Sequence, residues 1–437
     1  MSLRNYNLIS ILLIIFSIFL FFLGFYLEEN SAGAGSYSGD FSNVWKSLNT
    51  FLNNGIIEAI GLTAGGDLDV YKSSRTPLLY ILNKIFNPFV NSKSEFLISI
   101  FIFSLILPVL FYYFIRKKFK KIDLTLCLLI TSIVLFSPYF RTSSYWGLEE
   151  NYGLISLLIS FIFLQILFDN PLNKKNIKPA LYFFLILFSS LCVYFDHKLL
   201  IVPLICFGTI LLKEKSLAYK IFSIILFLIF SLPFIYLINI WGSIIPTVDK
   251  DLRYVGQAFH FIHPGYVISI IAFYLFPLIF FKEKRVEIII KDFFKSNFNK
   301  VCFLIFIFYL IILFLFNDFG LTYYDFGRGI THRVAVILFN NILFQEIFTY
   351  IIFLFSFFIL LIFFNENKKD LLLILYFLVT SIFILPIMQE YYDPLILIFI
   401  FAFFSKNFII NFKSIFALYF YYLFFLLSAN IYYQNLL

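Results

Sequence analysis

Residues 8–27 read LISILLIIFSIFLFFLGFYL and are followed directly by two carboxylates, Glu28 and Glu29. An uncharged apolar run of this length can cross a bilayer as a helix. Twelve further runs of this kind follow, at about 96–115, 124–139, 152–168, 179–194, 199–212, 221–240, 265–281, 301–316, 346–364, 371–388, 394–404 and 415–433. The pattern predicts an all-α polytopic membrane protein with about 13 transmembrane helices (about 11 if two short runs, 199–212 and 394–404, do not span).

The charged residues between these runs sort by side. With the N-terminus inside, alternate loops hold 22 of the 33 Lys and Arg residues, and the opposite loops hold most of the acidic residues. Cytoplasmic loops of membrane proteins carry such an excess of Lys and Arg. The sorting predicts an N-in, C-out topology with the chemically varied loops on the outer, periplasmic side.

Composition excludes several classes of protein. The chain is 62% hydrophobic and 13% charged, with a mean hydropathy of +0.94. This composition is not that of a soluble globular protein. Lysine-rich loops beside anionic lipid account for the net charge of +8, so nucleic-acid binding need not be invoked. The four cysteines fall inside predicted helices, and no nucleotide-binding motif is present. These features argue against a disulfide framework and an ATP-driven pump.

The first external loop, from Glu28 to about Ser94, is far longer than a helix connection requires. Apolar residues recur at helical spacing from Phe41 to Ile60, and a second amphipathic stretch ends near Val90. Helices of this kind lie flat in the lipid interface. They suit a protein whose substrate is itself a lipid.

Three short motifs give the chain a resemblance to the GT-C superfamily of membrane glycosyltransferases. Glu28-Glu29 stands where that family has an acidic pair after helix one, Arg75-Thr76-Pro77-Leu78 is similar to its basic-proline turn, and Tyr391-Tyr392-Asp393-Pro394 is similar to its late tyrosine-proline segment. The likeness is closest to the protein O-mannosyltransferases and the lipid A aminoarabinose transferase. It implies one transmembrane domain over 1–437, in a bacterial inner membrane, that moves a sugar from a polyprenyl-phosphate donor to a lipid-linked or surface glycan.

The chain departs from this family at several positions. Glu replaces the usual Asp of the acidic pair, Thr76 replaces the first proline, and Asp40 is an additional acid in the loop. Inverting transfer needs a carboxylate that accepts the acceptor proton, and a partly desolvated carboxylate at a membrane boundary can do so. Glu28, Glu29 and Asp40 are therefore all candidates for the base, although helix-end acids also simply mark the boundary with solvent.

A departing phosphate needs cations. Arg75 offers a planar fork suited to phosphate oxygens, and Lys72 lies three residues before it. Arg328 and Arg333 stand in a glycine-containing loop that could close over the same phosphate. The competing interpretations are an interfacial snorkelling arginine for Arg75 and an ordinary solvated loop for the later pair.

Two external turns and the late tyrosine-proline segment are rich in groups that bind sugars or acceptors. These groups are Arg141, Tyr145, Trp146, Glu149 and Glu150 in the first turn, Asp196 and His197 in the second turn, and Tyr391, Tyr392 and Asp393 in the late segment. An aromatic belt accounts for the rings but not for two adjacent acids, and a plain hairpin accounts almost equally well for the second turn. His260 and His263, with scattered aspartates, make no convincing metal site, so we expect no required cofactor or metal beyond the lipid-linked donor.

Two other functions compete with the transferase. A surface-polysaccharide polymerase shares the many helices and arginine-bearing loops, but its largest external loop usually comes later in the chain. A lipid-linked oligosaccharide flippase or exporter would need two pseudo-symmetric halves and polar helix interiors, and neither is evident.

Overall fold

The computed structural model describes residues 3–32, 37–66, 73, 75–169, 177–243, 246, 259–284, 286–316, 328–384 and 387–434. Every regular element in these ranges is a helix, which confirms the predicted all-α class. The described part of each of the thirteen predicted apolar runs contains one or more helices, and the run at 371–388 is helical from Leu371 to Ser381. Nine helices of the described chain are long and apolar enough to cross a membrane, or ten if one bent pair forms a single span. The remaining runs form shorter helices, so the count of thirteen spans and the N-in, C-out orientation stay predictions.

The chain divides into two compact units, one formed by Met1–Leu252 with Phe425–Leu437 and the other by Arg253–Phe424. The second boundary falls within α21 (Phe412–Tyr433). The first unit contains α1 (Leu3–Tyr26), α2 (Ser42–Asn53), α3 (Ile56–Gly61), α4 (Leu78–Phe86), α5 (Lys93–Ser104), α6 (Ile106–Lys118), α7 (Leu124–Ser132), α8 (Pro138–Trp146), α9 (Glu150–Asp169), α10 (Lys178–Phe195), α11 (Ile201–Lys213) and α12 (Leu217–Trp241).

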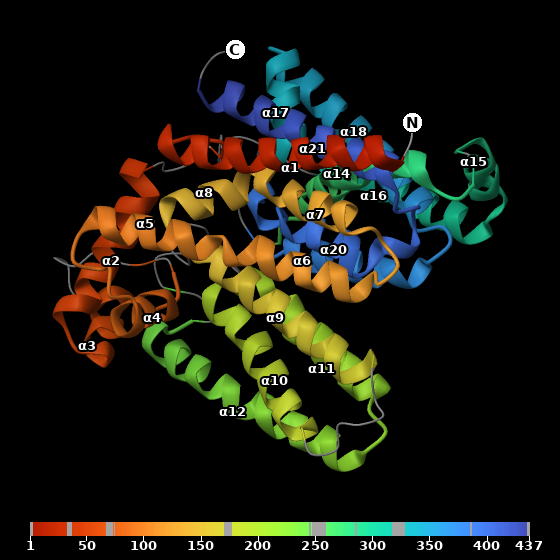
Figure 1. The fold of residues 1–437 in the computed structure, drawn as a ribbon. Coiled ribbons are helices and arrows are strands. Elements are labelled where there is room, and N and C mark those ends of the chain that lie inside the picture. Colours follow the sequence, from red (N-terminus) through yellow and green to blue (C-terminus); the bar gives the residue numbers. More distant parts are fainter. Residues whose placement is uncertain are drawn as a thin grey trace. The chain divides into compact units, whose positions relative to one another are not determined.

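In the first unit, α10 packs against both α9 and α12, and these three helices lie side by side in Figure 1. Helix α1 packs against α7, and much of its remaining surface carries exposed apolar side chains such as Leu8, Leu12 and Phe19. Apolar side chains on the outside of a long helix are stable in contact with lipid. The helix is therefore suited to a membrane span.

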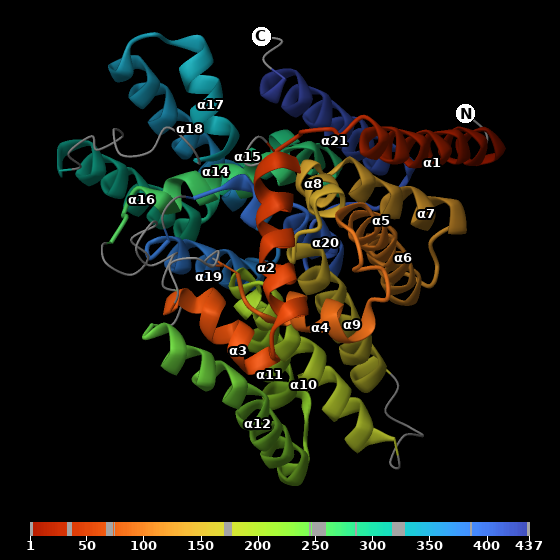
Figure 2. The same cartoon turned by 90° about the vertical axis from the view of Figure 1, so that its left-hand side faces the viewer.

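The first loop forms its own small helical group, visible in Figure 2 as α2, α3 and α4. Helix α2 buries Val44, Leu48 and Phe51, and it packs against α4. The Lys84 ammonium of α4 donates to the carbonyls of Phe51 and Asn54 at 2.6 Å each, which closes the C-terminal end of α2. The predicted amphipathic stretches are thus confirmed as helices, and their place in the lipid interface stays a prediction.

Helices α7 and α8 form the bent pair, which turns by 67°. At the bend, Ser137 accepts a hydrogen bond from the Phe140 amide at 3.0 Å and Pro138 occupies the first turn of α8. Both features favour a new helix start. The Arg141 Nη1 donates to the carbonyl of Leu135 at 2.9 Å, so a carbonyl freed by the bend is paired.

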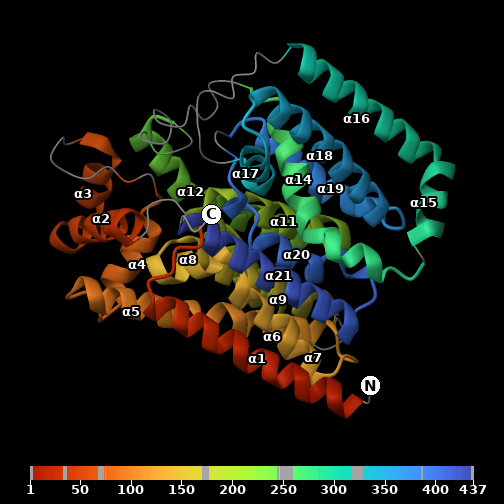
Figure 3. The same cartoon turned by 90° about the horizontal axis from the view of Figure 1, so that it is seen from above.

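The second unit contains α14 (His263–Leu275), α15 (Val286–Lys295), α16 (Asn297–Phe316), α17 (Gly329–Leu338), α18 (Ile342–Phe363), α19 (Leu371–Ser381), α20 (Leu395–Ala402) and most of α21. Helix α14 packs against α17, α18, α19 and α20, and Figure 3 shows it beside α18 and α19. The ring of Phe353 on α18 occupies the space beside Gly265, where a Cβ would lie 2.4 Å from it. This close approach lets the two helices pack tightly.

Candidate functional site

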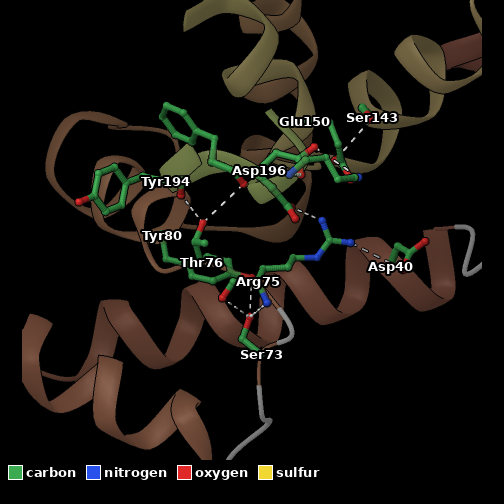
Figure 4. Close-up of polar contacts among 12 residues, drawn as sticks. Asp40, Ser73, Arg75, Thr76, Tyr80, Ser143, Glu150, Tyr194 and Asp196 are labelled. Carbon is green, nitrogen blue, oxygen red and sulfur yellow. Dashed lines mark hydrogen bonds and ion pairs between the residues drawn. The ribbon is translucent and has the colours of Figure 1, made fainter. Parts of the chain in front are cut away.

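Six charged residues from four separate segments of the first unit meet in one place. We call them the charged cluster: Asp40, Arg75, Glu149, Glu150, Asp196 and Lys198. Asp40 precedes α2, Arg75 precedes α4, Glu149 and Glu150 lie where α9 begins, and the last two residues follow α10. Figure 4 shows Arg75 directed at Asp40 on one side, with Glu150 and Asp196 on the neighbouring segments. The first-loop motif and both polar turns predicted from sequence are brought together here.

Ion pairs run through the cluster. Arg75 forms a short ion pair with Glu149, and its Nη2 lies 3.8 Å from Asp40 Oδ1. Lys198 Nζ lies 3.3 Å from Asp196 Oδ2 and 3.8 Å from Glu150 Oε1. The Asp40 side chain is 31% exposed, whereas that of Glu149 is 12% exposed. Asp40 is therefore the more open carboxylate on Arg75.

Local backbone structure determines the positions of Glu149 and Glu150. Gly147 ends α8 with φ +67°, a conformation in which most side chains are strained, and the Leu148 amide then donates to the Ser143 carbonyl at 3.0 Å. This tight turn places Glu149 and Glu150 at the start of α9. Ser143 Oγ also donates to Glu150 Oε2 at 3.5 Å, a long contact.

The Arg75 segment is tied to two neighbours. Its amide donates to Ser73 Oγ at 3.1 Å, and Ser73 Oγ lies 3.2 Å from the Tyr80 hydroxyl of α4. The next residue, Thr76, donates its hydroxyl to the carbonyl of Tyr194 at the end of α10. Figure 4 shows both ties, one on each side of Arg75. The backbone on both sides of Arg75 is thus held, by the first loop and by the α10 turn.

Burial and charge shift the proton affinities of the cluster. Burial raises the pKa of Glu149 to about 7, although Arg75 opposes the shift. Burial likewise raises the pKa of Asp196 against the opposing effect of Lys198. Burial disfavours the charged form of Arg75, but the attraction of Glu149 and Glu150 outweighs it and holds the pKa of Arg75 above its ordinary value. A permanently charged guanidinium therefore lies beside a carboxyl that can exchange a proton near neutral pH.

A second ion pair, the Glu29–Arg141 pair, connects α1 with α8. Arg141 Nε donates to Glu29 Oε1 at 2.9 Å, a second bond joins Arg141 Nη2 to Glu29 Oε2, and Nη2 also donates to the Leu20 carbonyl at 2.8 Å. Asn430 of α21, in the same unit, donates to Glu29 Oε1 at 3.1 Å. Arg141 is 1% exposed. The pair is buried and multiply bonded, so Glu29 is poorly suited to accept a proton from a substrate.

Gly24 makes this approach possible. A Cβ at this position would lie 2.2 Å from Arg141 Nη2, 2.3 Å from Glu29 Oε2 and 2.8 Å from the Tyr145 hydroxyl. Tyr145 itself donates to the Phe21 carbonyl at 2.6 Å, and Trp146 is 3% exposed. The predicted sugar-binding residues Arg141, Tyr145 and Trp146 are thus buried, and the polar groups of the first two bond to α1, to Glu29 after it and to the Leu135 carbonyl. Their contacts favour a structural role over contact with a sugar.

The remaining first-unit predictions have mixed surroundings. Glu28 is exposed, with its backbone at φ +52°. His197 packs edge-to-face against Phe234 and Trp241 of α12, and burial lowers its pKa to about 4. Lys72 lies outside the described residues. Of the three candidate bases, Asp40 alone combines partial exposure with a cationic neighbour.

The other predicted site residues belong to the second unit. Arg328 precedes α17 at φ +64° and donates its amide to the Ile387 carbonyl, and Arg333 lies on α17. Tyr391 follows in a 3₁₀ turn, and Tyr392 and Asp393 are each 4% exposed. Their roles in phosphate or sugar binding stay predictions.

Metal ligands are not grouped anywhere in the described ranges: no set of three or more His, Cys, Asp or Glu residues there could hold an ion. His260 and His263 stack on each other with ring centroids 4.8 Å apart, and His263 Nδ1 is 3.2 Å from the Ser381 carbonyl. These rings are placed by packing in the second unit.

Three contributors to the cluster lie in motifs recognised from the sequence but were assigned no role there. Lys198 bridges Glu150 and Asp196, Thr76 links the Arg75 segment to α10, and Tyr194 receives that link. A lysine two residues after an aspartate, between two apolar runs, was the available signal for Lys198. The roles of Thr76 and Tyr194 depend on contacts between distant segments, which no local pattern reveals.

Comparisons of this chain with protein-family models, curated proteins and solved structures gave no match.

Proposed function

We propose that this chain is an inverting membrane glycosyltransferase of the GT-C type. It would take a sugar from a polyprenyl-phosphate donor and transfer it to a lipid-linked or surface glycan at the periplasmic face of a bacterial inner membrane. The observation that carries the proposal is the placement of Arg75 between the partly exposed Asp40 and the buried Glu149, beside the ends of apolar helices.

In this reaction the Asp40 carboxylate accepts the proton of the acceptor hydroxyl as its oxygen attacks the anomeric carbon. The bond from that carbon to the phosphate oxygen breaks, and the polyprenyl phosphate leaves with the electron pair. Arg75 stabilises the charge that grows on the leaving oxygen. Because a single base and no covalent sugar–enzyme bond are used, the anomeric configuration inverts.

Glu149 gives the site a means to accept an anion. The cluster holds four carboxyl groups against two cations, an unfavourable balance for a phosphate. With a pKa of about 7, Glu149 can take up a proton near neutral pH and release Arg75 to the phosphate. Donor binding is then expected to weaken as pH rises above about 7.

The test is the mass profile of the surface glycan in a strain that lacks this gene and in strains restored with single variants. Wild type and Glu95→Gln, an exposed acid at the start of α5, should restore the glycan. Asp40→Asn, which keeps the side-chain shape, should lower transfer by about 10²- to 10⁴-fold, the usual contribution of a general base. Full activity of Asp40→Asn would reject this base.

The same profile separates the competing functions. Loss of one sugar or branch supports the transferase. Loss of long chains with one complete repeat unit retained would instead indicate a polymerase. An unchanged glycan would reject both enzymes for this glycan and favour a lipid-linked oligosaccharide carrier or a different acceptor.

A further inference from the structure

Helix α12 contains a proline in its interior. Pro233 lies within the helix, where it has no amide hydrogen to donate and its ring crowds the preceding turn. Next to it, the Phe234 amide donates to the Tyr194 hydroxyl at 3.0 Å, and that hydroxyl donates to the Phe230 carbonyl at 2.6 Å. An uninterrupted helix would pair this amide and this carbonyl with each other. A side chain from α10 therefore bridges the backbone ladder of α12.

Tyr194 is connected at its other end to the charged cluster. Its carbonyl accepts the Thr76 hydroxyl, and Thr76 follows Arg75 directly. Two residues further on, Asp196 accepts from the Lys198 amide at 3.0 Å and pairs with its ammonium group. One residue thus bonds to α12 through its side chain and to the Arg75 segment through its backbone.

The part of α12 that follows Pro233 supports the same turn. Phe234 packs edge-to-face against Tyr194 at 6.2 Å and against His197 at 5.5 Å between ring centroids, and Trp241 packs against His197 at 6.1 Å. Tyr194 and His197 flank Asp196. The orientation of the α10 turn is therefore set by the segment from Phe230 to Trp241.

We infer that Tyr194 is a positioning residue for the charged cluster: its hydroxyl, bonded to the Phe230 carbonyl and the Phe234 amide of α12, holds the turn that places Arg75 and Asp196. The inference rests on the proposed function, because the consequence is kinetic. Tyr194→Phe keeps the ring and removes the bridge, and the freed amide and carbonyl of α12 can then pair with each other. The fold should survive, whereas Arg75 shifts relative to the donor phosphate.

Kinetics with purified protein and a synthetic polyprenyl-phosphate sugar provide the first test. Tyr194→Phe should raise the donor KM by about ten-fold, as small misplacements of binding groups do, and leave the acceptor KM near wild type. Tyr113→Phe, on the lipid-exposed side of α6, is the matched control and should match wild type in both constants. A wild-type donor KM in Tyr194→Phe would overturn the positioning role and leave the transferase proposal intact.

A double-mutant cycle tests the connection itself. Thr76→Val removes the hydroxyl that bonds to Tyr194 and nearly preserves the side-chain shape, so it should also raise the donor KM. If both residues act through one connection, the double variant should be no worse than the poorer single variant. Multiplied effects would show that the two residues act separately and would overturn the inference.

Hydrogen–deuterium exchange of residues 228–240 gives a readout that needs no activity. Tyr194→Phe should change exchange in this segment and leave the rest of α12 as in wild type, because only the bridged bond differs. Unchanged exchange would show that the Tyr194 hydroxyl does not bond to this segment. Absence of transfer in wild type would reject the proposed function, and the exchange experiment would still decide whether Tyr194 is bonded to α12.

Discussion

Two arginine–carboxylate centres in the first unit use the same chemical groups for different ends. In the Glu29–Arg141 pair, Arg141 donates to Glu29 and also to the Leu135 and Leu20 carbonyls, and the pair is buried. In the charged cluster, Arg75 contacts one buried carboxylate, Glu149, and one at 3.8 Å that is 31% exposed, Asp40. The first centre is bonded to fixed protein groups on all sides, whereas the second has an open side.

The difference shows how a sequence with three candidate bases in one loop can use them unequally. A carboxylate whose oxygens are taken by a buried guanidinium stabilises packing, and removing it leaves a buried charge without a partner. A half-exposed carboxylate near a cation contributes little to stability and can exchange protons with a ligand. Burial and partner number, more than residue type, separate the two roles.

The largest expected effect comes from breaking the closed centre. Arg141→Met leaves Glu29 buried without its cation, which should lower the free energy of unfolding by about 3–5 kcal/mol. Thermal unfolding of purified protein in detergent measures the loss. The double variant Glu29→Gln/Arg141→Met should recover most of it, because no charge is then left unpaired. Wild-type stability in Glu29→Gln combined with lost transfer would contradict the structural role and make Glu29 the base.

The next effect concerns pH. The pKa of Glu149 is about 7 in the folded protein and about 4.5 when unperturbed, so the folded state binds more protons between these values. Stability should therefore fall as pH rises from about 4.5 to about 7, by up to about 3 kcal/mol, and stay level above that. Glu149→Gln should remove this fall. An identical pH dependence of unfolding in wild type and variant would show that Glu149 has no raised pKa.

A smaller effect on stability is expected from a substitution of Gly24 in α1. Gly24→Ala places a methyl group where Arg141 and Glu29 approach the helix, and at least one of them must move. Overpacking of this kind costs about 1–3 kcal/mol, and thermal unfolding again measures it. Gly39→Ala is a suitable control, because nothing lies within 4 Å of a Cβ there. Equal stability of the two variants would show that the pair does not depend on Gly24.

The smallest effect should come from Glu28→Gln. Glu28 is exposed, and exposed substitutions usually change stability by less than about 0.5 kcal/mol. The comparison of Glu28→Gln with Asp40→Asn in the glycan assay separates the two accessible candidates for the base. If transfer is lost in Glu28→Gln and retained in Asp40→Asn, the base is Glu28 and the charged cluster binds without accepting the proton.

The helices could be predicted because the signal is local and strong. The apolar runs and the helical spacing from Phe41 to Ile60 each fix a helix without reference to the rest of the chain. The break near Ser137 was not predicted, because residues 124–139 read as one continuous apolar run. The capping of Phe140 by Ser137 and the Arg141 contact to Leu135, which accompany the bend, are visible only in three dimensions.

The candidate site was predictable in its parts and not in its assembly. Arg75, Asp40 and the Glu149–Glu150 pair were each recognisable as polar groups beside apolar runs. Which acid would pair with which arginine depends on helix packing, so the sequence left Glu29 and Asp40 equivalent. Packing pairs Glu29 with Arg141 and brings Arg75 to Glu149. These pairings set which carboxylates are buried against an arginine.

The absence of a side chain at Gly24 limits which substitutions the sequence can accept during evolution. A larger side chain at position 24 can be accommodated only if the groups that approach it move, and these include both partners of the buried ion pair, Arg141 and Glu29. A substitution at position 24 therefore disturbs the pair as well. Descendants of this gene should therefore keep glycine, glutamate and arginine as an inherited set, or exchange all three together.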